Sequence, residues 1–398
     1  MKFNFKYMFS EYTPVLSFWL LFPGFFIYQV LINLSVIPSF LGGYFGIVSM
    51  IVFVPLLFLF FFQIIKSPKS LGLLDVSFLL LMLYIFLVSV SNYLLGEMAG
   101  YYDLLYWSLS GVIFNLACYF IAKYFHYGDE KVRRVLLVTF SLIVFMFLLN
   151  VRDGIFTLLN SGIEGAVTYQ GYARSVVAVS FILIASYRSA LVTIALTSLS
   201  IVILIIVGSR AELILYIGTL ISAYYIVRSS SIAGFSSVTL LYLVALLVFG
   251  LISQIILVSL EHTRLYDFIE NGIFTSSSGQ ARLELVRAGW ANIVDNPVFG
   301  RYGIYVKHFG SIGAYPHNLL SAWLNLGIIG FLGYLSVIFA VLFKALSVAR
   351  NHINSYSLLA LFFAIFIFLA FLTSKDYLFM FFGLSVGFSQ NIYQNRVI

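Results

Sequence analysis

Charged side chains are scarce in this sequence. Asp, Glu, Lys and Arg make up 9% of its 398 residues, whereas hydrophobic residues make up 62%. Soluble domains carry about 25% charged residues. A water-soluble fold could not bury this much apolar surface, and the mean hydropathy of +1.04 agrees. The composition therefore excludes a soluble domain and predicts a chain whose main solvent is lipid.

Other features are missing as well. Cys118 is the only cysteine, so an intrachain disulfide and a cysteine-based metal site are excluded. The first apolar stretch has no small-residue cleavage site, and we interpret it as a retained span rather than a signal peptide. The net charge is +7, but most basic residues lie in short loops between apolar runs. That placement argues against nucleic acid as a partner.

What the chain does contain is a series of continuous apolar runs, such as residues 51–65. A membrane β-barrel would instead show alternating segments of about 10 residues. Helices satisfy their own backbone in lipid, and each span needs about 20 residues. We therefore expect an all-α polytopic membrane protein with about twelve transmembrane helices. The expected spans are 14–34, 41–64, 72–95, 104–124, 134–150, 173–187, 189–207, 211–227, 236–258, 317–343, 354–373 and 376–393.

These spans divide the chain into helices 1–9 over 1–258, a long loop over 259–316, and helices 10–12 over 317–398. With the N-terminus inside, the inner loops hold 13 of the 22 Lys and Arg residues and the outer side holds 9. Cytoplasmic loops carry the excess of basic residues. We therefore expect both termini in the cytoplasm and the long loop outside.

The outer basic residues are concentrated. Eight of the nine lie in the loop 151–174, at the span edge at Arg210, and in the long loop 259–316. Such a cluster indicates an anionic ligand on the outer face. The alternative is that long loops cross the membrane regardless of their charge.

The first of these places contains Tyr169, Gln170 and Arg174 just before a span. Aromatic rings, an amide and a guanidinium could bind a sugar and a phosphate, or could form an interfacial aromatic belt with an anchoring arginine. The second place reads Gly208-Ser209-Arg210 at the start of a span. An arginine beside a helix N-terminus attracts phosphate. The alternatives are a snorkelling side chain or a local ion pair with a nearby glutamate.

The third place is the long loop. Residues 280–294 repeat apolar side chains at helical spacing, which predicts an amphipathic helix lying along the outer surface. Arg282 opens this helix, and Arg287 falls on a different face, because five residues turn the helix by about 140°. Arg301 could supply further charge. We keep all three as candidate ligands for an anion.

Next come Pro316, His317 and Asn318, at the start of the tenth expected span. A histidine there would lie near the positive end of the helix dipole, which favours the neutral imidazole. A neutral imidazole can accept a proton, although such a histidine is often only a polar interfacial residue. Gly327 and Gly330 form a small-residue pair that permits close packing by a neighbouring helix.

In order along the chain, these segments are Tyr-Gln-x-x-x-Arg, Gly-Ser-Arg, Gly-x-x-Arg with a later Trp, Asn-Pro-x-x-Gly, and His-Asn with Gly-x-x-Gly. The ordered set resembles the bacterial O-antigen polymerase and ligase superfamily, over roughly residues 168–335. No single motif is specific, and residues 1–165 match only in being multiple spans. The Arg210 segment has Ala where many relatives have Gly after Ser-Arg.

The resemblance implies a GT-C-like glycosyltransferase of the bacterial inner membrane with a periplasmic active site. It implies undecaprenyl-pyrophosphate-linked oligosaccharides as donor and acceptor, and a chain-length regulator as a further partner. Arg210, Arg282 and His317 match the family's catalytic positions. Tyr169, Gln170, Arg174, Asn318, Arg287 and Arg301 are then candidates for substrate binding.

The implied chemistry agrees with the residues. Arginines could stabilise the departing pyrophosphate where other transferases use a divalent metal. The sequence has no DxD motif, so we expect no metal and no other cofactor. His317 would orient or deprotonate the acceptor hydroxyl, or would hydrogen-bond the pyrophosphate. The rival bases are Glu261, Asp267, Glu270 and Glu284.

Two alternatives to a polymerase remain. A ligase would transfer the same chain to lipid A-core, but the Tyr-Gln-Gly-Tyr-Ala-Arg segment looks more like polymerases. A transporter of the lipid-linked unit would place ionisable residues near the membrane midplane. The spans here carry charge mainly at their ends, with Asp75 a partial exception. We expect an inverting, metal-independent polymerase of O-antigen repeat units.

Overall fold

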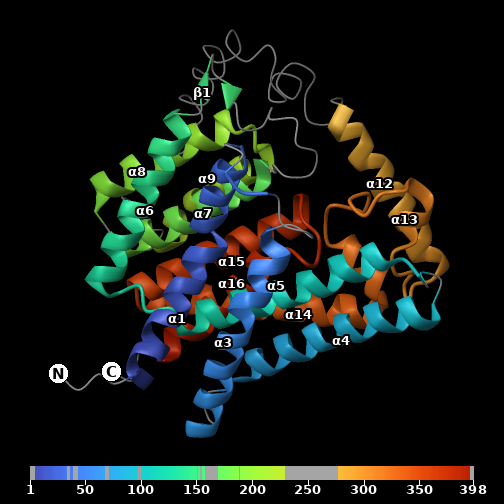
Figure 1. Cartoon of the computed structure of the whole chain (residues 1–398). Helices are drawn as coiled ribbons and strands as arrows, with labels where there is room; N and C mark the ends of the chain where they lie inside the picture. Colours follow the sequence, from blue (N-terminus) through green and yellow to red (C-terminus); the bar gives the residue numbers. More distant parts are fainter. Residues whose placement is uncertain are drawn as a thin grey trace.

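The computed structural model describes residues 5–33, 36–38, 44–67, 71–96, 98, 100–149, 151–152, 155–156, 169–187, 189–228 and 277–394. Almost all of these residues are helical (Figure 1). Two-residue strands β1 (Val151–Arg152) and β2 (Ile155–Phe156) form one antiparallel pair. The helices are α1 (Phe5–Leu21), α2 (Pro23–Asn33), α3 (Tyr44–Lys66), α4 (Leu73–Leu95), α5 (Tyr102–Tyr124), α6 (Glu130–Leu149), α7 (Tyr169–Tyr187), α8 (Ala190–Ile206), α9 (Arg210–Arg228), α12 (Ser277–Asp295), α13 (Ile304–Phe309), α14 (Leu320–Asn351), α15 (Ser355–Thr373) and α16 (Phe381–Gln394).

The described residues include seven helices that are long and apolar enough to cross a membrane: α3, α4, α5, α6, α9, α14 and α15. The protein is therefore an all-α, multi-pass membrane protein. The other expected spans correspond to shorter or less apolar helices, and span 236–258 lies outside the described residues. The first expected span, 14–34, is divided between α1 and α2. The break falls before Pro23, which starts α2, as suits a residue with fixed φ and no N–H.

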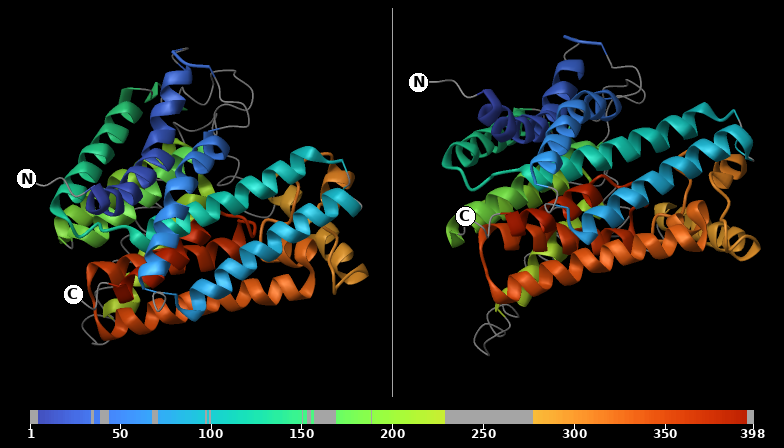
Figure 2. Two further views of the ribbon diagram at one scale, coloured as in Figure 1. Left: turned by 60° about the horizontal axis from the view of Figure 1, so that its bottom comes forward. Right: turned by 90° about the horizontal axis from the view of Figure 1, so that it is seen from below.

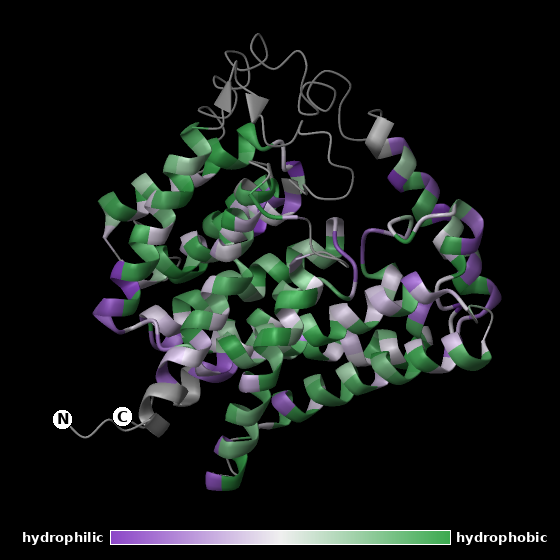
Figure 3. Ribbon diagram, viewed as in Figure 1, coloured by the Kyte–Doolittle hydropathy of each residue, from purple (hydrophilic) through white to green (hydrophobic). Residues whose placement is uncertain are grey.

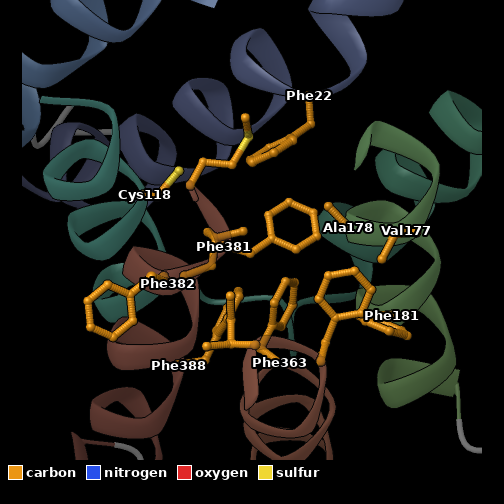
Figure 4. Close-up of a cluster of buried hydrophobic side chains, with 14 of the residues drawn as sticks. Phe22, Cys118, Val177, Ala178, Phe181, Phe363, Phe381, Phe382 and Phe388 are labelled. Carbon is orange, nitrogen blue, oxygen red and sulfur yellow. The ribbon is translucent and has the colours of Figure 1, made fainter. Parts of the chain in front are cut away.

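Hydrophobic residues run along the helices, whereas hydrophilic residues gather at helix ends and in the connections (Figure 3). The core is built from aromatic rings. Phe181, Phe363 and Phe381 meet between α7, α15 and α16, with Phe22 and Phe388 beside them (Figure 4). Cys118 is fully buried in the same cluster. This packing joins helices from both ends of the chain into one body.

Helix α16 packs against α5 with almost no space between the backbones. A Cβ atom added to Gly383 would lie 2.0 Å from the carbonyl oxygen of Asn115. The Asn115 side chain donates to the carbonyl of Leu378 (2.8 Å) and accepts from the N–H of Gly383 (3.1 Å). These bonds fix the segment that precedes α16. The expected span 376–393 thus starts later, at Phe381, and residues 374–380 form a buried connection.

An ion pair lies at the opposite end of the bundle from His317. The carboxylate of Asp75 meets the Lys123 ammonium at 2.9 Å, and the hydroxyl of Tyr119 donates to the same oxygen at 2.5 Å. Both charged side chains are at most 1% exposed. The other Asp75 oxygen accepts from the N–H of Gly72 (2.8 Å) and so caps α4. The charges therefore tie two helix ends together.

Helix α14 is broken at Gly327, whose φ of 66° and ψ of −174° are not helical. The segment 296–300 lies against this break. The N–H of Ile328 donates to the carbonyls of Pro297 and Val298 (3.1 Å each), and the N–H of Arg301 donates to the carbonyl of Leu324 (2.6 Å). A lipid-exposed break would leave these groups without partners. The sequence predicts a neighbouring helix at the glycine pair, but at Gly327 the neighbour is this segment; at Gly330 it is Tyr84 of α4.

Substituting Gly327 by Ala should destabilise the protein. A Cβ atom there would lie 2.1 Å from the carbonyl oxygen of Val298, in a backbone conformation that is essentially restricted to glycine. We expect the free energy of unfolding to fall by about 2 kcal/mol or more. Thermal unfolding of the purified protein in detergent measures the change.

The control is Gly333→Ala in the same helix, where the nearest atom to the added Cβ is 3.8 Å away. This variant should keep or slightly raise the unfolding temperature, because alanine favours a helix. Equal unfolding temperatures for the two variants would mean that the break at Gly327 is not needed.

Candidate functional site

The site is built around a buried carboxylate at the start of α9. Glu212 is 1% exposed. Ser209, in the turn with positive-φ Gly208, donates its hydroxyl to Oε2 of Glu212 at 2.5 Å. The Lys375 ammonium lies 2.5 Å from Oε1, and the Nε of Arg174 lies 3.8 Å from the same oxygen. One negative charge therefore faces two positive charges.

The two cations share an aromatic neighbour. The Arg174 guanidinium lies 5.1 Å and the Lys375 ammonium 5.2 Å from the centre of the Phe379 ring. Cations at such distances are attracted to a ring face. Gln170, one turn before Arg174 on α7, accepts from its guanidinium at 2.7 Å. Gln170 therefore orients Arg174. Tyr169 starts the same helix, and its side chain lies outside the description.

Arg210 is the first residue of α9 and is half-buried. The sequence leaves open a local ion pair between Arg210 and Glu212, two residues later. In the structure the Glu212 carboxylate instead has Lys375 and Arg174 as ion-pair partners. Arg210 thus lies at the same helix end as this group of charges, where the α9 N-terminus also favours anions.

Asp376 follows Lys375 and is 7% exposed. The backbone N–H groups of Leu378 and of Asp376 itself hydrogen-bond its carboxylate. One of its oxygens, Oδ2, has no hydrogen-bond partner among the described residues. Burial raises the pKa of this carboxyl from 3.8 to about 6, although the Arg174 guanidinium acts in the opposite direction. The group is thus a carboxylate at neutral pH that readily takes a proton.

His317 lies three residues before α14, rather than in its first turn as the sequence predicts. Its ring centre is 4.6 Å from that of Tyr315. The pKa of His317 is lowered to about 4, first by burial and then by the charges of Arg282 and Lys375. The imidazole is neutral, the state expected from the sequence. The physical cause, however, is burial and two cations rather than the helix dipole.

Tyr315 is the aromatic centre of the site. Its ring lies 5.8 Å from Trp107 and 5.9 Å from Tyr305. Burial raises the pKa of the Tyr315 hydroxyl, and the Asp376 carboxylate raises it further, while Arg174 and Arg282 lower it. The hydroxyl therefore remains protonated and can donate. Tyr305 and Tyr377 are also buried, and the hydroxyl oxygens of both have no hydrogen-bond partner among the described residues.

The structure thus brings together three of the predicted residues. Arg174 from α7 and Arg282 from α12 both interact electrostatically with Tyr315 and with Lys375. His317, before α14, interacts with Arg282 and Lys375. Gln170 and Arg210 adjoin this group, whereas Asn318, Arg287 and Arg301 have different surroundings. Asn318 caps α14 by accepting from the N–H of Leu320 at 3.0 Å.

Two predicted arginines occupy separate positions. Arg287 is exposed and lines an open hollow with Gln280, Leu283 and Glu284. It is turned away from Arg282, as the helical spacing predicts. Arg301 donates to the side chain of Asn292 at 3.3 Å, beside the break in α14. Among the rival bases, Glu284 is exposed on α12, and Glu261, Asp267 and Glu270 lie outside the described residues.

Sequence reasoning missed the functional potential of Lys375 and Asp376. The only sequence signal is a Lys-Asp pair between two apolar runs, which is usual for a short polar turn. Their burial follows from the packing of α16 on α5. Within the described part of the chain, no group of three or more His, Cys, Asp and Glu residues could hold a metal ion. Metal independence of the activity remains a prediction.

No family model matches this sequence, and no curated protein matches it significantly.

Replacing Asp376 by Asn should stabilise the protein near neutral pH. The folded-state pKa of this carboxyl, about 6, lies above its ordinary value of 3.8. The stability that it contributes is therefore complete below the ordinary value and is lost as the pH rises through the folded-state value. Asn does not ionise and escapes this loss. We expect a higher unfolding temperature for the variant at about pH 7.5 and no difference at about pH 4.

Asp295→Asn, at the exposed end of α12, provides the matched control and should change the unfolding temperature little at either pH. If Asp376→Asn unfolded at the same temperature as the wild-type protein at the higher pH, the carboxyl would not be buried as described.

Proposed function

We propose that this protein is an inverting glycosyltransferase that polymerises O-antigen repeat units. It transfers an oligosaccharide chain from undecaprenyl pyrophosphate onto the next lipid-linked repeat unit, at the periplasmic face of the bacterial inner membrane. The observation that carries the proposal is the group of cations from α7, α12 and the α15–α16 connection around one neutral imidazole and two buried carboxylates, Glu212 and Asp376. Such a group suits an anionic leaving group and a hydroxyl nucleophile in one place.

In this reaction the acceptor hydroxyl oxygen attacks the anomeric carbon of the donor from the face opposite the pyrophosphate. The bond between that carbon and the phosphate oxygen breaks, and its electron pair remains on the pyrophosphate. Arg174, Arg282 and Lys375 supply positive charge at this end of the bundle, with Arg210 at the α9 N-terminus adding to it. Guanidinium groups can donate two hydrogen bonds to a phosphate. Attack from the opposite face inverts the anomeric configuration.

The hydroxyl proton needs an acceptor, and the pKa values favour Asp376. A base works best when its pKa lies near the working pH. The carboxyl of Asp376 has a pKa of about 6, whereas the pKa of His317 is about 4. We assign proton abstraction to Asp376, and to neutral His317 the orientation of the hydroxyl or a hydrogen bond to the pyrophosphate. Of the three roles that the sequence leaves open for His317, this assignment excludes proton abstraction and keeps the other two.

The membrane arrangement belongs to the same proposal. Both termini lie in the cytoplasm, as the positive-inside pattern predicts. About twelve spans, counted from the apolar runs, form the bundle, and the family resemblance implies that it is GT-C-like. The seven long apolar helices support the bundle. The Asp75–Lys123 ion pair lies at the end opposite His317 and is closed by Tyr119. Transporters usually carry ionisable residues along a pathway through the membrane. Because this ion pair is buried and closed, it does not provide such a pathway, and it does not favour a transporter.

His317→Ala, Arg282→Ala and Arg210→Ala should each abolish long-chain product while the protein still folds and inserts. Each variant removes a group that contacts the leaving group or the acceptor in the proposed reaction. The assay follows chain length in proteoliposomes that contain purified protein and lipid-linked repeat units, without an ion gradient. Arg134→Ala, an exposed arginine at the opposite end, is the matched control and should elongate chains normally.

Wild-type chain lengths in the three site variants would refute the assignment. Translocation of the lipid-linked unit without elongation would indicate a transporter. Transfer that occurs only after lipid A-core is added would indicate a ligase.

The elongation rate should depend on pH in a way that separates the two candidate bases. If Asp376 accepts the proton, the rate falls as the pH drops through about 6, because the carboxylate becomes protonated. If His317 accepts it, the fall occurs near pH 4. Rates at saturating substrate are measured across this range. Asp376→Asn should be slow at every pH and should lose the fall near 6.

A further inference from the structure

Helix α12 lies outside the long apolar helices. Figure 1 shows it running across the end of α4, α5 and α14, and both views of Figure 2 place it at that same end. Gly289 packs against Pro316, because a Cβ atom there would lie 2.4 Å from the proline ring. Ile293 is buried, at 2% exposure. One face of α12 therefore packs on the segment that carries His317, and this is also the side of Arg282.

A second face of α12 is apolar and uncovered by the described residues. Leu283, Trp290 and Val294 fall within about 40° of one another around the helix, and Trp290 and Val294 are 50% and 60% exposed. Val298 and Phe299, in the segment that follows, are 50% and 84% exposed. We call these five residues the α12 apolar patch. Exposed apolar groups of this kind mark an interaction surface.

The patch continues into the lipid-facing side of α14. The Trp290 ring meets the Trp323 ring edge-on at 6.2 Å, and Trp323 stacks on Phe331 at 4.9 Å. Leu332, which follows Phe331, is 55% exposed, and Ile329 shares the exposed face of Leu332 at 64% exposure, on a helix long and apolar enough to span a membrane. The same apolar surface therefore runs from the transmembrane part of α14 onto α12.

The polar residues of α12 fit this arrangement. Glu284 and Asp295 are exposed on the side away from the patch, and Gln280 and Arg287 lie at the border between the two. Tryptophan is enriched at the membrane–water boundary, and arginines border the apolar face of helices that lie in the interface. At the break in α14, the N–H of Ile328 donates to the carbonyls of Pro297 and Val298. These hydrogen bonds fix the segment that carries Val298 and Phe299 against α14.

We propose that the α12 apolar patch docks into the interfacial region of the lipid bilayer, so that the membrane itself holds α12 across the bundle end. Arg282 is exposed but projects from the same side of the helix as Gly289, and it is thereby kept within electrostatic reach of Tyr315 and His317. The occupant is lipid rather than another protein, because the patch is continuous with a lipid-facing helix. The docking itself does not depend on the proposed transfer reaction.

Spin labels test the proposal in the full chain reconstituted in phosphatidylcholine and phosphatidylglycerol vesicles. Cys118→Ala gives a cysteine-free background, because the chain has one cysteine. Labels at Val294→Cys and Phe299→Cys are compared with labels at Ala281→Cys and Asp295→Cys, which are exposed outside the patch. The ratio of collisions with oxygen to collisions with a water-soluble nickel complex should be several-fold higher at 294 and 299 than at the two control positions.

A high nickel collision rate at 294 and 299 would overturn the proposal, since the patch would then face water. Low rates with both reagents would also overturn it, because another protein or a second copy would then cover the patch. A measurement without cysteine substitution uses brominated lipid. The wild-type protein should lose a larger part of its tryptophan fluorescence than Trp290→Phe does, and equal quenching would contradict lipid contact at Trp290.

Discussion

The ion pairing of buried Glu212 is the interaction on which the candidate site depends. Its carboxylate joins the start of α9 to Lys375 in the α15–α16 connection and to Arg174 on α7. Two cations this close, and this far from water, would repel each other strongly without the carboxylate. The carboxylates of Glu212 and Asp376 together balance Lys375 and Arg174. The excess of positive charge at this end of the bundle therefore comes from Arg282 and Arg210. Glu212 thus makes it possible to hold cations in an apolar bundle and still attract an anion.

The same constraint explains the neighbouring groups. His317 stays neutral because it is buried beside cations, and Asp376 ionises reluctantly because burial outweighs the attraction of Arg174. The pKa of His317 is therefore lower than its ordinary value in water, and the pKa of Asp376 is higher than its ordinary value. Perturbed pairs of this kind are common at catalytic sites, although structural ion pairs produce them too. Their position beside Arg174, Arg282 and Lys375 favours the functional interpretation.

Backbone geometry places these side chains. The break of α14 at Gly327 and the insertion of residues 296–300 set where α12 lies, and so where Arg282 lies. The close contact of Gly383 with α5 sets where the connection 374–380 lies, and so where Lys375 and Asp376 lie. Both arrangements require glycine, since a side chain would collide with a carbonyl oxygen. Positions far from the charged groups thus determine the geometry of the site.

Helical spacing accounts for part of this site. Gln170 and Arg174 are one helical turn apart, so their pairing follows from spacing alone. The opposed faces of Arg282 and Arg287 follow from the same geometry. The importance of Asp376 could not be predicted, because a Lys-Asp pair between apolar runs has the same composition as an exposed turn. The division of the first span into α1 and α2 was missed, although Pro23 marks the break.

The sequence by itself determined that the chain is a helical membrane protein, because hydropathy and run length are local properties that lipid selects directly. It also placed Arg210 at the start of a helix. Only the tertiary structure decided which of these charges meet. Burial and pairing depend on contacts between residues distant in the chain, such as Glu212 with Lys375 and Arg174 with Glu212, and no local pattern encodes them.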